Sequence, residues 1–337
     1  MMRHLRRVPM LALGLAAILT LTSTARAADA KERGFHWEKN EEQKTADLKY
    51  GDQPVLRYMH AYDPSSKARL DETYKVYHHV FGPGTGTLIT KGAGGLFPHH
   101  RGLYVGWNKT QAGGQSYDFW HCTKGAHQKH VAFKEMTGDA ESGTMTAEIH
   151  WNDADGKPVI VESRTVTVSK VPASGAPGYG WQIDWSTKLE SRHGEIELTG
   201  DRQHAGFQYR AAQSVAESKG ARYVRPEAFP QQPEAVQVGD SGDPPAHINL
   251  GWFAMTSEID GKRYTVEYFE DPSLPKPSLY SERPYGRFGA FFKAKVTEEQ
   301  PLEMQYRLVV TTGETPERDA IQKRYDEFVS ELKSGAK

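Results

Sequence analysis

The sequence predicts an all-β protein, a large antiparallel β-sandwich with one C-terminal α-helix. Apolar and polar residues alternate with a period of two in many short segments, as they do in strands that bury one face. Gly- and Pro-rich turns separate these segments, and only one stretch has a helical repeat. This combination favours antiparallel strands over alternating strands and helices.

The alternation is clearest over residues 144–151, 181–189 and 302–310, and each of these segments is predicted to be a half-buried strand. The polar stretch 152–156 predicts a loop that joins the first of them to another strand at 159–168.

A hairpin is predicted around Asp260-Gly261, because this dipeptide favours the two-residue turn between antiparallel strands. Its strands should run over 252–259 and 263–269. Segments 170–180 and 226–247 are rich in Pro, Gly and small polar residues, and the second is long enough to be a functional loop. Strands continue on both sides of these segments, so neither is predicted to be a domain boundary.

The predicted helix begins near Thr315, which can cap it, with Pro316 in the first turn and Glu317 at the positive end of the helix dipole. The apolar residues that follow fall on one face, so the helix is expected to cover a sheet. These residues are Ile321, Tyr325, Phe328, Val329 and Leu332.

Residues 1–27 have the features of a secretory signal peptide: arginines, an apolar run over 8–21 and the cleavage site Ala25-Arg26-Ala27. We therefore predict a periplasmic or secreted protein with no membrane span after cleavage. Residues 28–50 are polar and are expected to form a partly loose N-terminal segment, and residues 51–337 a single β-sandwich domain.

The chain without its leader is mildly acidic. The leader contains four arginines and no acidic residue, which leaves 38 Lys and Arg against 43 Asp and Glu. A net charge near −5 argues against nucleic acid and anionic membranes as partners, and it leaves the oligomeric state open. Cys122 is the only cysteine, so no internal disulfide forms, and we interpret it as a buried thiol. Its position beside His121 leaves thiolate chemistry or metal ligation open.

The strongest functional signal is the segment 98–102, Pro-His-His-Arg-Gly, followed by the segment 118–121, Asp-Phe-Trp-His. Imidazole is the side chain best suited to proton transfer near neutral pH, and a carboxylate can orient it. The proline and the glycine predict a bend in which either His99 or His100 faces a pocket and the other supports the structure.

Two later segments could reach the same cavity. Residues 201–204, Asp-Arg-Gln-His, precede Tyr209 and Arg210, and Arg287 belongs to an Arg-rich segment that suits anion or hydroxyl binding. Trp107 and Trp120 either stack on a sugar ring or belong to the core. The predicted catalytic residues are His100, His121, Asp118 and His204. The predicted substrate-binding residues are His99, Arg101, Trp107, Trp120, Tyr209, Arg210 and Arg287.

Motifs for common cofactors are absent: the sequence has no HExxH, no paired-cysteine motif, no dinucleotide fingerprint and no P-loop lysine. No cofactor is therefore predicted. We interpret the adjacent pair His78-His79 as structural.

The pairing of His99-His100-Arg101-Gly102 with Asp118-Phe119-Trp120 resembles the bacterial PmoA family, secreted proteins with a DUF6807-type domain. Residues 283–288 and the run 302–328 resemble the same family, and the likeness covers residues 55–330. The resemblance implies a supersandwich-like fold similar to galactose mutarotase, with sugars bound in a cleft of His, Arg, Trp and acidic residues. A methane oxygenase subunit, which the family name implies, would span the membrane, and no segment after the leader is apolar enough to do so.

The leading hypothesis is an exported carbohydrate-active enzyme that uses His and Asp for general acid–base chemistry on a glycoside or modified sugar. Hydrolase, lyase and epimerase reactions all fit. In this hypothesis Asp118 orients a histidine, Arg101 clamps a polar substrate group and His204 is the second acid or base. One alternative is a metal-dependent oxidoreductase with copper, zinc or iron bound by histidines. The other is a non-catalytic glycan-binding protein.

Overall fold

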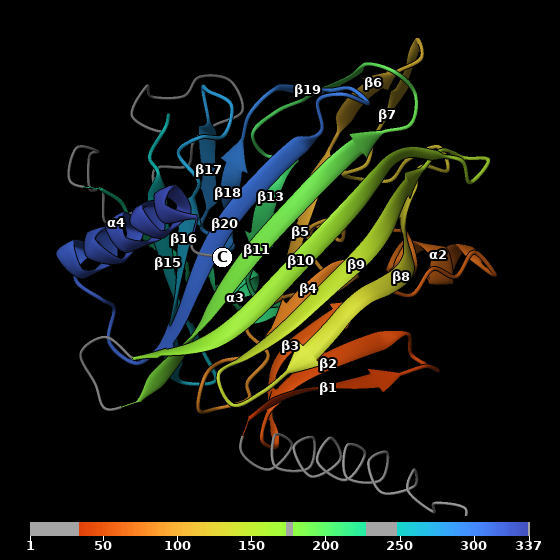
Figure 1. The fold of residues 1–337 in the computed structure, drawn as a ribbon. Coiled ribbons are helices and arrows are strands. Elements are labelled where there is room, and N and C mark those ends of the chain that lie inside the picture. Colours follow the sequence, from red (N-terminus) through yellow and green to blue (C-terminus); the bar gives the residue numbers. More distant parts are fainter. Residues whose placement is uncertain (1–33, 173–177, 227–247, 336–337) are drawn as a thin grey trace, which may run out of the picture.

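The computed structural model describes residues 34–172, 178–226 and 248–335, and it has the predicted all-β architecture with a C-terminal helix. Two eight-stranded antiparallel sheets lie one in front of the other, and a four-stranded sheet lies at one end (Figure 1). Helix α4 (Arg318–Ser334) packs on the outer face of the front sheet. No helix within the described ranges is both long and apolar enough to cross a bilayer.

The first sheet, at the back of Figure 1, carries the candidate site. Its strands, in spatial order, are β1 (Phe35–Asn40), β2 (Thr45–Tyr50), β3 (Gln53–Met59), β4 (Tyr77–Val80), β5 (Leu103–Trp107), β13 (Ala205–Arg210), β18 (Arg287–Phe291) and β17 (Leu279–Arg283).

The second sheet contains most of the long strands. Their spatial order is β14 (Arg222–Val224), β15 (Trp252–Ile259), β16 (Lys262–Glu270), β20 (Leu302–Thr312), β11 (Tyr179–Ser191), β10 (Pro158–Pro172), β9 (Ser142–Asn152) and β8 (His127–Gly138). The small sheet contains β19 (Ala294–Val296), β12 (Ile196–Thr199), β6 (Lys109–Ala112) and β7 (Gln115–Tyr117). Two short helices, α2 (Lys67–Thr73) and α3 (Gln213–Ser218), lie in connections between strands.

Aromatic rings join the two large sheets in the core. Trp185 from β11 lies 4.7 Å from Phe207 of β13 between ring centroids, and Phe207 lies 4.7 Å from Tyr306 of β20. All three residues are at most 1% exposed. Such pairs add to the stabilisation that the buried apolar area provides.

One fully buried ion pair lies on β10. Arg164 donates through Nε to Glu162 Oε1 at 2.7 Å and through Nη2 to Oε2 at 3.0 Å. Trp151 Nε1 and Thr187 Oγ1 donate to the same carboxylate at 2.8 and 3.3 Å. The Glu162 carboxylate thus exchanges water for four hydrogen bonds.

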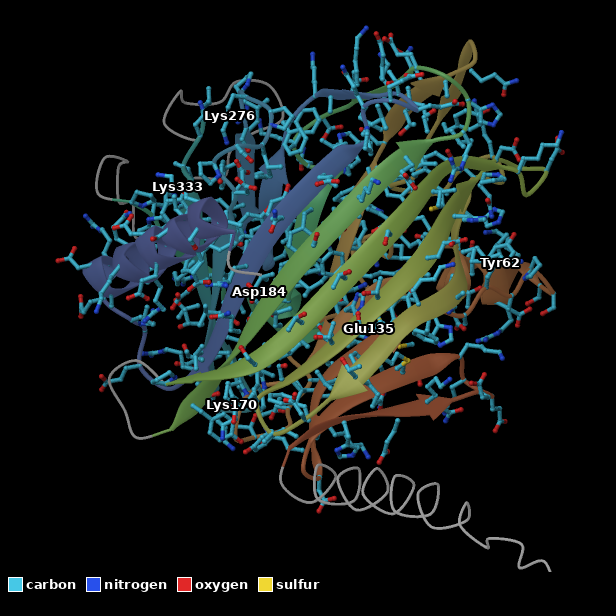
Figure 2. All side chains as sticks on the ribbon, viewed as in Figure 1. Tyr62, Glu135, Lys170, Asp184, Lys276 and Lys333 are labelled. Carbon is cyan, nitrogen blue, oxygen red and sulfur yellow. The ribbon has the colours of Figure 1, made fainter. Side chains whose placement is uncertain are left out.

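Asp184 of β11 lies on the outer face of the second sheet, beside the part that α4 covers (Figure 2). Arg307 of β20 donates through Nε to Asp184 at 2.5 Å and through Nη2 to Glu331 of α4 at 2.7 Å. This arginine therefore ties the helix to the sheet.

The predicted strands and the hairpin are confirmed. The alternating segments lie within β9, β11 and β20, and β15 and β16 are joined at Asp260-Gly261, both of which have a positive φ. The left-handed conformation at both positions is what the two-residue turn requires.

The C-terminal helix begins slightly later than predicted. Its N-cap is Glu317 rather than Thr315, and it makes no side-chain capping hydrogen bond. Ile321 and Phe328 are buried against Trp252 and Phe269. The predicted apolar stripe therefore covers the second sheet.

The prediction of a loose segment over 28–50 is wrong for its described part. Residues 35–40 and 45–50 form β1 and β2, which pair with each other, and β2 also pairs with β3. Phe35, Ala46 and Leu48 are fully buried, so this polar-looking stretch contributes one apolar face to the core. The predicted signal peptide, residues 173–177 of the segment 170–180 and nearly all of 226–247 lie outside the described residues.

The pair His78-His79 is buried in β4, as the structural interpretation expects. The His78 ring stacks on Tyr58 with centroids 4.6 Å apart, and His79 Nδ1 lies 3.0 Å from Thr90 Oγ1. Burial, with a smaller effect of Arg57, lowers the pKa of His79 to about 4. Both imidazoles are therefore neutral in the folded protein.

We expect the free energy of unfolding to fall as the pH drops from about 6.5 towards 4, because His79 takes up a proton more readily in the unfolded chain. One pKa unit corresponds to about 1.4 kcal/mol, so His79 alone accounts for roughly 3 kcal/mol. Urea unfolding at pH 7.5 and pH 4.5 measures this loss. It should be smaller in His79→Gln, and an equal loss in both proteins would contradict the assignment.

Candidate functional site

The candidate site lies on the face of the first sheet that points away from the second sheet. Along β5, Val105 belongs to the main core, whereas its neighbour Tyr104 packs against Trp120 on the opposite face. Three connecting segments meet there: the one before β5, the one after β7 and the turn before β13. They carry all the imidazoles that the sequence singled out as functional.

Four imidazoles form one group, called here the histidine cluster: His99, His100, His121 and His204. The centroid of the His99 ring lies 4.2 Å from that of His100, 4.6 Å from that of His121 and 5.7 Å from that of His204. The His204 ring lies 4.9 Å from His121 and 5.8 Å from His100. Residues that are distant in the sequence thus converge, as the site prediction requires.

Two of these rings are held by the same local turn, Asp-x-x-His. Asp118 Oδ1 accepts hydrogen bonds from the backbone N–H of the second and third residues after it, at 2.9 and 2.7 Å, and its Oδ2 lies 2.8 Å from His121 Nδ1. Asp201 makes the corresponding bonds at 2.9 and 3.1 Å, and its Oδ1 lies 3.0 Å from His204 Nδ1. Each carboxylate places the ring proton on Nδ1 and leaves Nε2 free.

Asp201 is a site residue that the sequence prediction left out of its catalytic set. Asn108 Nδ2 donates to Asp201 Oδ2 at 2.8 Å and fixes the carboxylate further. The signal that could have found it is the repeated Asp-x-x-His spacing of 118–121 and 201–204.

Burial shifts the pKa of two cluster imidazoles, and hydrogen bonds shift that of the Asp201 carboxylate. Burial, with smaller effects of His121 and Lys75, lowers the pKa of His99 to about 3. Burial and then Arg287 lower the pKa of His100 well below its usual value. Burial alone would raise the pKa of Asp201, but hydrogen bonds from His204 and the backbone lower it to about 2. His99 and His100 are therefore neutral and Asp201 is ionised near neutral pH.

A cavity of about 470 Å³ opens the cluster to solvent. Its volume is in the range of small-molecule sites in proteins. It is lined by Asp71, Glu72, Tyr74, Gly94, Pro98, His99 and His121. A second cavity of about 550 Å³ reaches Asn108 and Asp118, and no imidazole of the cluster lines it.

Neither predicted tryptophan is available to stack on a sugar. Trp107 is fully buried in the main core and its Nε1 donates to Phe292 O at 3.2 Å, so its assignment to substrate binding is wrong. Trp120 is also fully buried and contacts His100 and His204 edge-on, with centroids 5.6 and 6.1 Å away. Trp120 therefore packs against the buried side of the cluster and helps to position these two rings.

Arg101 and Tyr209 are likewise structural rather than substrate-binding residues. The Arg101 guanidinium donates to backbone oxygens of Pro98 at 3.0 Å and Glu72 at 2.7 Å, and it lies 4.1 Å from the Tyr74 ring centroid. It thus ties the bend to α2. Tyr209 is buried, and its hydroxyl donates to Ile89 O at 3.0 Å.

Lys75 is a second residue that the sequence prediction missed. It is 1% exposed, its Nζ donates to Trp120 O, and it lies 4.0 Å from the centroid of the Tyr104 ring. Burial lowers its pKa to about 7. Burial also raises the pKa of the nearby Cys122 thiol to about 12. The residue as a whole is half-buried, which is less than the interpretation as a buried thiol expects.

Three members of the cluster could hold a metal ion. One ligand atom each from His99, His100 and His204 lies within 4.8 Å of the other two. Asp201 would support His204 from behind, as carboxylates commonly do for ligating histidines.

Comparisons with solved structures return carbohydrate-active proteins at low similarity. A GH36 α-galactosidase from Geobacillus stearothermophilus is 10% identical with a TM-score of 0.37, over 84% of this chain and 41% of that one. A galactose mutarotase related enzyme from Lactobacillus acidophilus is 10% identical with a TM-score of 0.36, over 84% of this chain and 98% of that one. An α-N-acetylgalactosaminidase from Bifidobacterium bifidum, in complex with GalNAc, is 10% identical with a TM-score of 0.31 over 88% and 38%. No curated protein sequence matches the chain significantly.

The fold and the site define a β-sandwich protein with a solvent-accessible cluster of imidazoles. Residues 45–326 match the model of DUF6807, a family of unknown function, and the chain belongs to this family. The match bears out the DUF6807 part of the resemblance and attaches no methane oxygenase activity to it.

Proposed function

We propose that the protein is an exported carbohydrate-active enzyme that moves protons to and from a glycoside or modified sugar. The observation that carries this proposal is the pair of Asp-x-x-His turns, whose His121 and His204 rings face each other 4.9 Å apart between centroids. One ring accepts a proton through Nε2 while a protonated partner donates one, which general acid–base catalysis requires.

The cavity supports a sugar as the substrate class. It has the volume for a small ligand, and both carboxylates and imidazoles offer partners for hydroxyl groups. Tyr74 and Tyr285 are half-buried near the cluster and offer aromatic faces in place of the buried tryptophans.

The test is a screen of glycosides and keto-glycosides in D₂O, followed by mass spectrometry. Hydrolysis splits the substrate and adds water, elimination yields an unsaturated fragment, and epimerisation places deuterium on carbon without cleavage. No turnover of any compound by the wild-type protein would contradict the proposal.

A metal-dependent oxidoreductase is the second candidate, and the closeness of His99, His100 and His204 favours it. Elemental analysis of protein purified without chelators decides this point. A stoichiometric content of copper, zinc or iron would show that His204 is a metal ligand rather than a proton-transfer residue.

A further inference from the structure

Four cations are buried around the histidine cluster. Lys75 is 1% exposed, Lys91 is 5% exposed, and Arg210 and Arg287 are fully buried. Lys75 acts electrostatically on both His99 and His100, Lys91 acts on His99, and Arg287 acts on His100. Arg210 lies 4.9 Å from the centroid of the Tyr285 ring, which lies 6.3 Å from that of His100. These charges therefore belong to the same site as the imidazoles.

None of the four cations forms an ion pair with a carboxylate in the described ranges. Lys75 and Lys91 donate to backbone oxygens, Arg210 Nη1 donates to Tyr285 O, and Arg287 Nη1 donates to Ser281 Oγ at 2.9 Å. Asp118 and Asp201 already bind the cluster histidines. Asp71 and Glu72, which line the cavity, pair with the exposed Lys67 and Arg69 of α2. Arginine stays charged in proteins, so Arg210 and Arg287 give the site unbalanced positive charge. Buried charge without a counter-ion is strongly unfavourable.

The two arginines are also placed directly opposite each other. Arg210 on β13 and Arg287 on β18 are partners in the antiparallel register, and like charges in such a pair destabilise a sheet. Burial and, to a smaller extent, Arg287 lower the pKa of Arg210 to about 10. An arrangement with this cost is expected where a ligand compensates for it.

Unused hydrogen-bond donors lie in the same region. Nε and Nη2 of Arg210, Nε and Nη2 of Arg287, and Nε1 of Trp120 are buried and have no partner in the described part of the chain. His100 Nδ1 is a further polar atom without a partner. Guanidinium groups bind carboxylates through paired N–H donors, and such charge-assisted bonds are the strongest class in proteins.

We propose that the site binds a sugar acid, whose carboxylate is the missing counter-ion of Arg210 and Arg287. The carboxylate part of this inference stands on the buried cations, and the sugar part rests on the proposed function. A uronic acid would then be distinguished from the corresponding neutral sugar by its C6 carboxylate alone.

The test is calorimetric binding of glucuronate and galacturonate, with glucose and galactose as matched neutral sugars. Sodium acetate tests whether a carboxylate without a sugar is enough for binding. Glucose 6-sulfate tests whether a sulfate can replace the carboxylate on the sugar. We expect the uronates to bind at least tenfold more tightly than every other compound, because only they combine a sugar ring with a carboxylate that matches the paired N–H donors of a guanidinium group. Equal binding of a neutral sugar, of acetate or of the sulfate would overturn the inference.

Arg287→Met and Arg210→Met should each reduce uronate affinity at least tenfold and leave the weak binding of glucose unchanged. Arg263→Met, an exposed arginine on β16 paired with Glu258, is the control and should bind uronates like the wild type. Should neither core variant fold, Lys75→Met gives the same test. Unchanged uronate affinity in a folded variant would refute the assignment of these cations.

This experiment does not depend on turnover. Uronate binding without conversion would support the inference and count against the acid–base proposal. Conversion of neutral glycosides without any preference for uronates would support the acid–base proposal and contradict the inference of a sugar-acid site.

Discussion

Replacing His121 with Ala is expected to lower kcat by a factor of roughly 10²–10⁴ on whatever sugar the protein converts, because that is the usual contribution of a positioned acid or base. His121 is partly exposed at the cavity, and its Nε2 is left free by the bond between Nδ1 and Asp118. The measurement is single-turnover kinetics on the first substrate that the screen identifies.

The matched control is His150→Ala. His150 Nε2 lies 3.0 Å from Glu148 on β9, which is a similar histidine–carboxylate pair on the other sheet. It should have wild-type kcat. Equal kinetics of the His121 and His150 variants would remove His121 from the mechanism.

Asp118→Asn isolates the tautomer of the same ring. The amide oxygen keeps the two backbone hydrogen bonds, so the turn survives, but the amide NH₂ now donates to Nδ1 and moves the ring proton to Nε2. A loss of kcat comparable to that of His121→Ala, without a change in melting temperature, is the expected result.

The second large effect concerns stability. Glu162→Ala should lower the free energy of unfolding by about 3–5 kcal/mol, because Arg164 would remain buried and charged without a partner. Trp151 Nε1 would lose its acceptor as well. Urea denaturation followed by tryptophan fluorescence measures the change.

Replacing both members of the pair is the control. The double variant Glu162→Leu with Arg164→Met keeps the apolar volume and removes both charges, so it should unfold much closer to the wild type than Glu162→Ala does. A double variant as unstable as the single one would show that packing around β10, rather than charge, sets the cost.

The fold could be predicted because the sequence patterns that indicate its strands and turns each lie within a single element. Alternation over 144–151 and 181–189 and the Asp260-Gly261 turn each act within one element. Residues 35–50 were misjudged because their strands bury few side chains and carry many charges, so pairing with neighbouring strands decides their structure.

The site could be predicted in part. The imidazoles stood out by residue type and by their spacing to Asp118, and the structure brings them together. The roles of Trp107 and Arg101 could not be predicted, because the residue type alone does not tell whether a side chain is buried in the core or faces the site. Their burial depends on which strand lies opposite, and that is a property of the complete sheet.

The order of the strands determines the stage of synthesis at which the histidine cluster can assemble. The histidine cluster takes its rings from two stretches of the chain that are separated by β8 to β12, and β5 and β13 become neighbours only after those strands are made. A chain that is still being synthesised, or is kept extended for passage through a membrane, has no assembled centre. The site is therefore assembled only after the strands up to β13 have been made and the chain has folded.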